Sequence, residues 1–186
     1  MIPSVIVNLA IVLCMAGAIM THGKHSPMKV VLRYFTALSN VLCAIAALAV
    51  VIGRLCGHVP QAVLVLKYVG TCAVSVTMLT VLVFLGPTIG YKPLLTGPDF
   101  WLHLVCPILA IVSLLAWDRP SMGVGAVLLG ALPVAAYGVL YLYKVILAPP
   151  EKRWDDFYGF NRGGKWPVSF AAMTAGALLV SWVFWL

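Results

Sequence analysis

Six long apolar segments, separated by short polar connections, make up most of this 186-residue chain. A helix needs roughly 20 residues to cross the hydrocarbon core of a bilayer. Only 9% of the residues are charged and the mean hydropathy is +1.06, which excludes a water-soluble domain. We therefore predict an all-α integral membrane protein whose residues 1–186 form a single six-helix domain with short loops. The predicted transmembrane helices are Ile2–Met20, Val30–Ile52, Leu64–Gly86, Phe100–Ala116, Gly123–Leu147 and Trp166–Leu186.

Basic residues flank these segments, where they orient a membrane protein. Of the 12 Lys and Arg residues, all but Arg54, Lys67 and Arg119 lie in or beside the first, third and fifth connections. Cytoplasmic loops carry the excess of positive charge. These three connections are therefore predicted in the cytoplasm and both termini on the non-cytoplasmic side. The net charge of +7 is explained by this asymmetry and does not indicate a nucleic acid partner. The short loops are typical of a bacterial inner membrane protein.

Small residues recur where helices are expected to approach closely, at Ala16-Gly17-Ala18, Gly123/Gly125/Gly130 and Ala172/Gly176. The first run also has the look of a signal-peptide cleavage site. No Lys or Arg precedes it, however, so we expect the first segment to be retained. Five cysteines lie mostly inside the segments without metal-ligand spacing. They are interpreted as packing residues, and neither a metal nor a cofactor is predicted.

Two prolines, Pro107 and Pro133, lie within predicted helices. A proline inside a helix removes one backbone hydrogen bond to the carbonyl four residues earlier and favours a kink. For Pro107 the freed carbonyl belongs to His103. The kink is expected to open the backbone at the histidine, although bending alone would also explain it.

His103 is the only histidine inside an apolar segment, and an ionisable group in that setting is a functional-site candidate. On the second segment, Thr36, Ser39, Asn40 and Cys43 follow at i, i+3, i+4 and i+7 and share one helix face. Asn40 is costly against lipid, so this face is expected to point into the bundle. A purely structural role, in which these side chains join helices, is the alternative.

Topology brings these two features together. The second and fourth segments both start from connections assigned to the cytoplasm, so Thr36 and His103 are expected at similar depth. Both lie near helix N-termini, where the dipole and free amides favour negative charge. That setting disfavours imidazolium and leaves His103 able to accept a proton. A histidine beside a hydroxyl is a minimal activated nucleophile, and the nearby amides are candidates for an oxyanion hole.

Further polar residues approach the same face. Tyr141 and Lys144, on the fifth segment, are candidates to donate to an oxyanion or to bind a carboxylate, and Asp155 and Asp156 are candidates to orient the histidine. Interfacial anchoring of the tyrosine and snorkelling of the lysine are the alternatives. The fifth connection, 148–165, is interpreted either as a solvated interfacial loop or as a lid that touches the site.

The segment Tyr34-Phe35-Thr36-Ala37-Leu38-Ser39-Asn40, together with His103 followed by Pro107, resembles the androgen-induced-gene and androgen-dependent-TFPI-regulating protein family. Bacterial six-span relatives share its Phe-Thr-x-x-Ser-Asn pattern. Characterised members are multi-span proteins that hydrolyse fatty acid esters of hydroxy fatty acids with a threonine nucleophile and an intramembrane histidine. The resemblance implies that Thr36 is the nucleophile and His103 its general base.

The sequence thus predicts an intramembrane ester hydrolase acting on a lipid substrate with long acyl chains. Ser39, Asn40, Tyr141, Lys144, Asp155 and Asp156 are its predicted supporting residues. One alternative is a non-enzymatic lipid-binding or small-solute transport protein whose polar stripe lines a cavity. Another is a structural subunit in which Asn40 and His103 hydrogen-bond helices together. No Asp or Glu lies in any segment, which argues against a transporter built on buried carboxylates.

Overall fold

The computed structural model describes residues 1–186, and all of its regular structure is helical. Three of the long helices contain a π-helical stretch, marked η, near one end. In chain order the elements are α1 (Ile2–His25), α2 (Met28–Val31), α3 (Phe35–Leu55), α4 (Gln61–Leu79), η1 (Thr80–Leu85), α5 (Gly86–Ile89), α6 (Pro98–Phe100), η2 (Trp101–Val105), α7 (Cys106–Ala116), α8 (Ala126–Leu142), η3 (Tyr143–Leu147), the 3-10 turns η4 (Pro150–Lys152) and η5 (Arg162–Gly164), and α9 (Trp166–Trp185).

Six continuous helical stretches are long and apolar enough to cross a membrane, which confirms the predicted number and order. They are Ile2–His25, Phe35–Leu55, Gln61–Ile89, Pro98–Ala116, Ala126–Leu147 and Trp166–Trp185. The predicted start of the second helix at Val30 is wrong, because α2 ends at Val31 and α3 begins at Phe35. Tyr34 between them has extended backbone, with φ −84° and ψ 134°. The turn is held by the Tyr137 hydroxyl, which donates to the Arg33 carbonyl at 2.7 Å.

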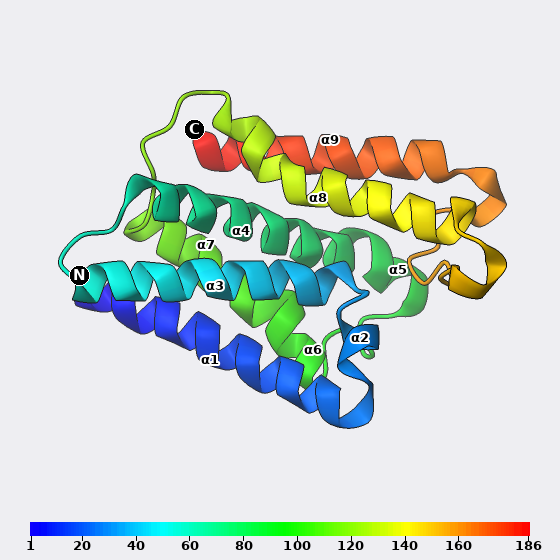
Figure 1. Ribbon diagram of the computed structural model, residues 1–186, viewed down its shortest axis with the longest axis horizontal. Helices are drawn as coiled ribbons and strands as arrows, with labels where there is room; N and C mark the ends of the chain where they lie inside the picture. Colours follow the sequence, from blue (N-terminus) through cyan, green and yellow to red (C-terminus); the bar gives the residue numbers. More distant parts are fainter.

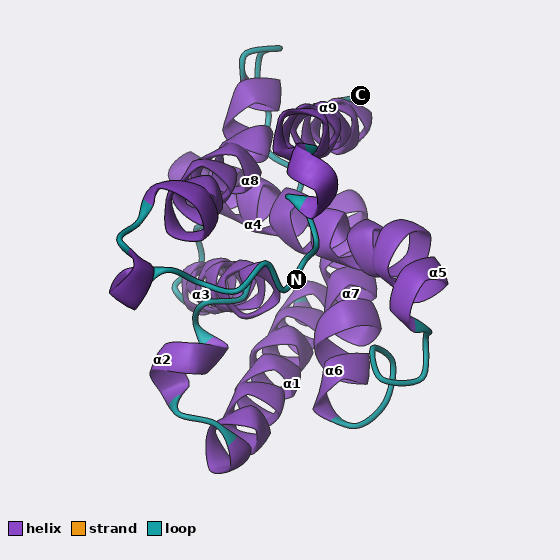
Figure 2. Cartoon of the chain, turned by 90° about the vertical axis from the view of Figure 1, so that its right-hand side faces the viewer, coloured by secondary structure: helices purple, strands orange, loops and turns teal.

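Both termini lie at the same end of the bundle, at the left of Figure 1, together with the connections α3–α4 and α7–α8. The first, third and fifth connections gather at the opposite end, which faces the viewer in Figure 2. Helix α4 runs through the middle and packs against α3, α7, α8 and α9. The connections that hold most of the basic residues therefore share one end of the molecule.

Close contacts between helices depend on Gly70, Gly130 and Gly138. A Cβ on Gly70 of α4 would lie 2.9 Å from the Cα of Cys43 on α3, and a Cβ on Gly130 or Gly138 of α8 would collide with Ser181 or Phe170 of α9. The predicted packing role of Gly130 is therefore confirmed. It is wrong for Gly17, Gly123, Gly125 and Gly176, where an added Cβ would meet nothing within 4 Å. For Gly176 the reason is that α9 lies at the edge of the bundle.

The outward faces of the helices are apolar. Large hydrophobic side chains are more than half exposed on all six stretches, among them Leu13, Ile52, Val83, Leu115, Leu128 and Leu179. A water-soluble protein rarely exposes so continuous an apolar surface, whereas helices that contact lipid require one. The fold therefore has the surface of a membrane-spanning bundle.

Three π-helical turns widen the helices at the end opposite the termini. The amides of Gly86, Cys106 and Ala148 bond to carbonyls five residues earlier, those of Val81, Trp101 and Tyr143. Each of these donors directly precedes a proline, Pro87, Pro107 or Pro149. A proline has no amide hydrogen and its ring clashes with the carbonyl four residues back. The preceding turn therefore widens, and such π turns are frequent at functional sites.

Candidate active site

Thr36 and His103 meet at the end of the bundle that carries the basic connections. Thr36 is the second residue of α3, and His103 lies in the π turn η2. The Thr36 Oγ1 and His103 Nε2 atoms are 3.2 Å apart, which is hydrogen-bond distance. His103 is 6% exposed, while Thr36 is partly exposed. The similar depth expected from topology therefore brings the two side chains into contact.

The other ring nitrogen of His103 fixes the direction of this hydrogen bond. Its Nδ1 lies 2.7 Å from the carbonyl oxygen of Leu94, in the third connection. A carbonyl only accepts, so in the neutral ring the proton is on Nδ1 and the lone pair is on Nε2. The Thr36 hydroxyl is then the donor to Nε2. This is the arrangement that a general base needs in order to take a proton from a hydroxyl.

Asn40 and Ser39 hold the first turn of α3 against its neighbours. The Asn40 amide donates to the Thr36 carbonyl at 2.8 Å and to the Leu102 carbonyl, next to His103, at 3.1 Å. The Ser39 hydroxyl donates to the Thr36 carbonyl at 3.1 Å and lies 2.9 Å from the Thr77 hydroxyl on α4. The predicted polar stripe therefore faces the bundle interior, and Asn40 joins the two backbones that position the pair.

The N-terminus of α3 presents free amides beside the threonine. The Phe35 amide donates to the Tyr158 hydroxyl at 2.9 Å, and the Thr36 amide lies close to the same hydroxyl. The amides of Thr36 and Ala37 have no backbone partner. Free first-turn amides and the helix dipole attract negative charge. An oxyanion that forms on a group attached to Thr36 would lie near these donors.

The fifth connection folds over the site rather than extending into solvent. The rings of Tyr34 and Phe157 are 4.6 Å apart, and the Tyr158 hydroxyl reaches the start of α3. Burial raises the pKa of Tyr158 to about 12, although the Phe35 amide that it accepts from works the other way. The phenol therefore stays neutral at physiological pH. The fifth connection was interpreted either as a solvated interfacial loop or as a lid that touches the site, and in the structure it contacts the site.

Asp155 and Asp156 of the fifth connection, predicted to orient His103, do not contact it. Asp156 accepts from the Tyr141 hydroxyl at 2.8 Å and from two loop amides, those of Phe160 and Asn161, so it orders the loop. Asp155 is exposed and makes no side-chain hydrogen bond. The orienting partner of His103 is thus the Leu94 carbonyl and neither aspartate.

Lys144 and Tyr141 do not face the Thr36 hydroxyl with free donors. The Lys144 ammonium lies 5.8 Å from the ring centres of Tyr143 and Trp154. The Tyr141 hydroxyl donates to Asp156 and accepts from the Tyr158 amide at 3.1 Å. Both residues therefore brace the loop, which leaves the α3 amides as the available donors.

A cavity of about 430 Å³ opens beside the Thr36–His103 pair. Its wall is mostly apolar, and its polar residues include the hydrogen-bonded side chains of His22 and Asp99, with Nε2 and Oδ1 3.1 Å apart. The lining residues are His22, Ser26, Val30, Val31, Tyr34, Thr36, Ala37, Leu85, Ile89, Leu94, Asp99, Leu102, His103, Phe157 and Tyr158. An apolar molecule with one polar end fits this distribution.

Leu94, Tyr158, His22 and Asp99 take part in the site, yet no sequence pattern singled them out. Leu94 acts through its main-chain carbonyl, which carries no residue signature. His22 was assigned to a polar connection, whereas α1 continues to His25 and carries it into the cavity wall. Tyr158 could have been found only from the density of aromatic residues in the fifth connection.

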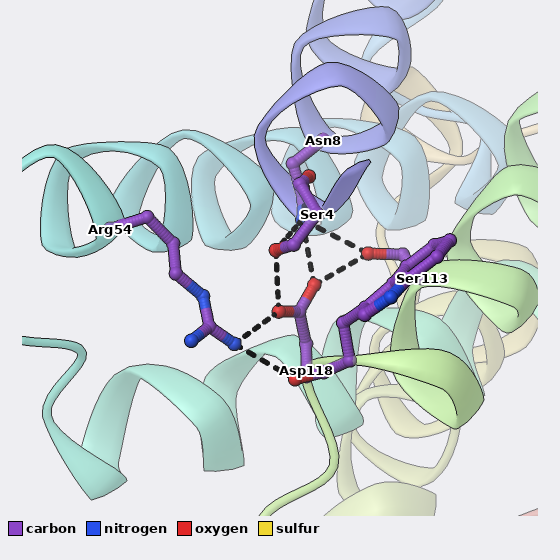
Figure 3. Close-up of polar contacts among 6 residues, drawn as sticks. Ser4, Asn8, Arg54, Ser113 and Asp118 are labelled. Atoms are coloured by element: carbon purple, nitrogen blue, oxygen red, sulfur yellow. Dashed lines mark hydrogen bonds and ion pairs between the residues drawn. The ribbon is translucent and has the colours of Figure 1, made fainter. Parts of the chain in front are cut away.

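A second polar cluster lies at the opposite end of the bundle, around Asp118 (Figure 3). Asp118 Oδ1 accepts from the Ser4 hydroxyl at 2.7 Å and the Arg54 guanidinium at 3.0 Å. Its Oδ2 accepts from the Asn8 amide at 2.7 Å and the Ser113 hydroxyl at 2.6 Å. Asp118 is fully buried although it follows α7, so the molecule does contain a buried carboxylate. Both carboxylate oxygens accept two hydrogen bonds each, so the cluster joins α1, α3 and α7 and has a structural role.

Lys67 on α4 is also buried at this end, with no exposed surface and no hydrogen-bond partner for its ammonium nitrogen. The sequence predicts Lys67 to be a flanking charge. That interpretation is wrong, because Lys67 lies inside α4 where neighbouring helices cover it completely. No ion pair joins Lys67 to Asp118, whose ion-pair partner is Arg54.

Comparison of the chain with protein-family models, with curated proteins and with solved structures gives no match. The class of protein is therefore defined by the fold and the site alone: an all-helical bundle of six apolar, membrane-length helices with a threonine–histidine pair beside a cavity at one end.

Proposed function

We propose that this chain is an integral membrane hydrolase that cleaves long-chain acyl esters, with Thr36 as nucleophile and His103 as general base. The observation that carries the proposal is the oriented pair: Thr36 Oγ1 lies 3.2 Å from Nε2, and the Leu94 carbonyl at 2.7 Å holds the proton on Nδ1. A buried histidine that serves only to join helices has no need of a hydroxyl partner at the edge of a cavity.

The reaction follows from this geometry in two balanced steps. Nε2 takes the hydroxyl proton as Thr36 Oγ1 attacks the ester carbonyl, and the α3 amides of Thr36 and Ala37 stabilise the oxyanion. Collapse breaks the bond to the alcohol oxygen, which takes the proton from Nε2 and leaves as the alcohol. Water then attacks the acyl-threonine, again losing its proton to Nε2, and the products are a carboxylic acid and free Thr36.

The substrate class is proposed from the cavity and from the resemblance. A mostly apolar wall with a few polar groups, the His22–Asp99 pair among them, suits an ester of long chains with a polar end. Fatty acid esters of hydroxy fatty acids, the substrates of the androgen-induced-gene family, have this character. The motif residues Tyr34–Asn40, His103 and Pro107 support membership of that family. The basic connections support a site at the cytoplasmic face of the membrane, and the short loops favour a bacterial inner membrane.

The first test is labelling of the purified protein with a fluorophosphonate, mapped by mass spectrometry, combined with hydrolysis of long-chain esters. Thr36→Ala is expected to abolish labelling and to lower kcat by about a thousandfold. His103→Ala is expected to lower it by about a hundredfold or more with the thermal unfolding midpoint retained. Thr36→Ser keeps a hydroxyl and is expected to retain part of the activity.

Matched controls come from the same end of the bundle. The Thr88 hydroxyl bonds only to carbonyls of its own helix, and His25 is exposed outside the cavity. Thr88→Ala and His25→Ala are therefore expected to stay within about twofold of the parent kcat. Folded protein that binds an ester but neither hydrolyses it nor reacts with the probe would reject the hydrolase in favour of lipid binding or transport. Unfolding of His103→Ala would favour the structural role.

A further inference from the structure

An apolar groove of about 370 Å³ lies on the outer flank of the bundle, between α4–η1 and α9. It is distinct from the cavity that holds His103, with which it shares no residue. No charged side chain lines it. The lining residues are Val76, Leu79, Thr80, Val83, Phe84, Phe160, Ser169, Ala172, Met173, Gly176 and Val180.

A small apolar cavity of about 50 Å³, here called the neck, lies between the groove and the site and shares lining residues with both. At its outer end the neck shares Thr80, Phe160 and Met173 with the groove. At its inner end it reaches Thr36 and Tyr158, which also line the His103 cavity. Thr36 therefore lies where a path from the outer flank meets the cavity that opens at the end of the bundle.

Polar contacts between α4–η1 and α9 are few along the groove. Near the termini, the Tyr68 hydroxyl donates to the Ser181 carbonyl at 2.6 Å. Toward the site, the one polar contact between the two helices is the Thr80 hydroxyl at 3.9 Å from the Met173 sulfur. Between these points α9 presents Gly176, where an added Cβ would meet open space. Because Gly176 has no side chain, the groove stays open at this position.

The lining chemistry selects the occupant. Neither the groove nor the neck contains a charged residue. Their polar atoms are mainly hydroxyls, and those of Thr77, Thr80 and Ser169 donate to carbonyls four residues earlier. The neck is small and its wall is mainly apolar, which suits a hydrocarbon chain. The groove also lies on a surface where large apolar side chains such as Val83 are exposed, as expected of a face in contact with lipid.

We propose that the groove and neck form a lateral entry for the acyl chain of the substrate. The ester approaches sideways from the bilayer, its unbranched chain lies along α4 and α9, and its carbonyl reaches Thr36 through the neck. The alcohol part then occupies the cavity beside His103. This inference rests on the proposed hydrolase function and adds the route and the position of the acyl chain. Met173 and Phe160 form the gate between groove and neck.

Filling the groove tests the proposal through chain-length dependence. Gly176→Trp is expected to lower kcat/KM for a palmitoyl ester by about tenfold or more, because each buried methylene contributes to binding. Hydrolysis of the butyryl ester, too short to reach the groove, is expected to stay within about twofold of the parent. Ala175→Trp is the matched control, since Ala175 is an exposed neighbour on α9 outside the groove; it is expected to change neither rate. Equal effects on both esters, or none, would overturn the entry route.

Photo-crosslinking gives a readout that does not depend on catalysis. A long-chain fatty acid with a mid-chain diazirine, in vesicles containing the protein, is expected to label Met173 and Val83 above Leu128 and Leu132, exposed residues of α8. Gly176→Trp is expected to remove the excess label. Even labelling of all exposed apolar faces would overturn the proposal. If the protein hydrolyses no ester but is still labelled in the groove, the hydrolase proposal is rejected and the groove is retained as a binding site for an acyl chain.

A second copy of the chain is the competing occupant. Gly176→Cys in a Cys56→Ser background, which lacks the exposed native thiol, is expected to stay monomeric on oxidation in vesicles. Efficient disulfide-linked dimers would show that α9 packs on α9 and would overturn lipid entry through this groove.

Discussion

At the scale of single residues, Asp118 has the strongest predicted effect on stability. It is fully buried and accepts from four donors, one of them the Arg54 guanidinium. Asp118→Asn keeps the shape but turns an amide toward these donors and leaves Arg54 without its counter-charge. We expect a loss of about 3 kcal/mol in the free energy of unfolding, measured by tryptophan fluorescence in detergent. Asp155→Asn, at an exposed carboxylate, is expected to change it by less than about 0.5 kcal/mol.

The same residue predicts a pH dependence. Burial by itself raises the pKa of Asp118, but hydrogen bonds from Ser113, Asn8, Ser4 and Arg54 outweigh it and hold the pKa below its ordinary 3.8. A carboxyl group with a lowered folded-state pKa contributes stability above its unfolded pKa, and this contribution is lost as pH falls through the folded value. The stability difference between the parent and Asp118→Asn is therefore expected to be constant from about pH 7 to 5 and to shrink below about pH 4. A difference that grows on acidification would contradict this assignment.

Some residues of the site could be predicted from the sequence and others could not. Thr36, Asn40 and His103 could be predicted because hydroxyl, amide and imidazole groups are conspicuous in apolar helices. Leu94 could not, since any residue supplies a carbonyl. Lys67 was misread, and Asp118 was not singled out, because charge at the end of a hydrophobic segment suggests exposure, whereas both side chains are buried here.

At the scale of secondary-structure elements, the π turn η2 sets the direction in which His103 points. Pro107 has no amide hydrogen to donate to the His103 carbonyl. The turn before it widens, and the Cys106 amide donates to the Trp101 carbonyl, five residues earlier. Pro107→Ala is expected to let α7 continue as a regular α-helix and to rotate His103 away from Thr36. The expected result is a decrease in kcat of about tenfold or more, with an unchanged or higher unfolding midpoint.

Pro133 provides the matched control. It lies inside α8, where the helix remains regular and no π turn adjoins it. Pro133→Ala is expected to leave kcat within about twofold of the parent. Equal losses in both variants would mean that helix bending in general, and not the orientation of His103, accounts for the effect.

The apolar length of a helix can be predicted from the sequence, whereas a break that depends on distant side chains cannot. All six spans could be predicted because their apolar length is set by the bilayer. The break at Tyr34 could not, since Tyr34 has no special backbone preference and its conformation depends on Tyr137 and Tyr158 from distant parts of the chain. The kink at Pro107 was expected, whereas the π turn at each of three prolines emerged only from the hydrogen bonds.

At the scale of the whole molecule, the separation of the two polar sites makes the membrane orientation testable. The Thr36–His103 site lies at the end with the basic connections, and the Asp118 cluster lies at the end with both termini (Figure 1). The positive-inside rule assigns the first of these ends to the cytoplasm. A lipid ester hydrolysed there would release its products to the cytoplasmic side.

Native Cys56 provides the measurement. It is exposed, and it lies in the connection between α3 and α4, at the end with the termini. A membrane-impermeant maleimide is expected to label Cys56 in intact cells and to leave a Cys56→Ser variant unlabelled. A single thiol placed at the other end, Lys152→Cys in the Cys56→Ser background, is expected to react only after the cells are permeabilised, because Lys152 is exposed on the fifth connection. The reverse pattern would place the active-site end outside the cell, so the ester would have to be hydrolysed on the outer face.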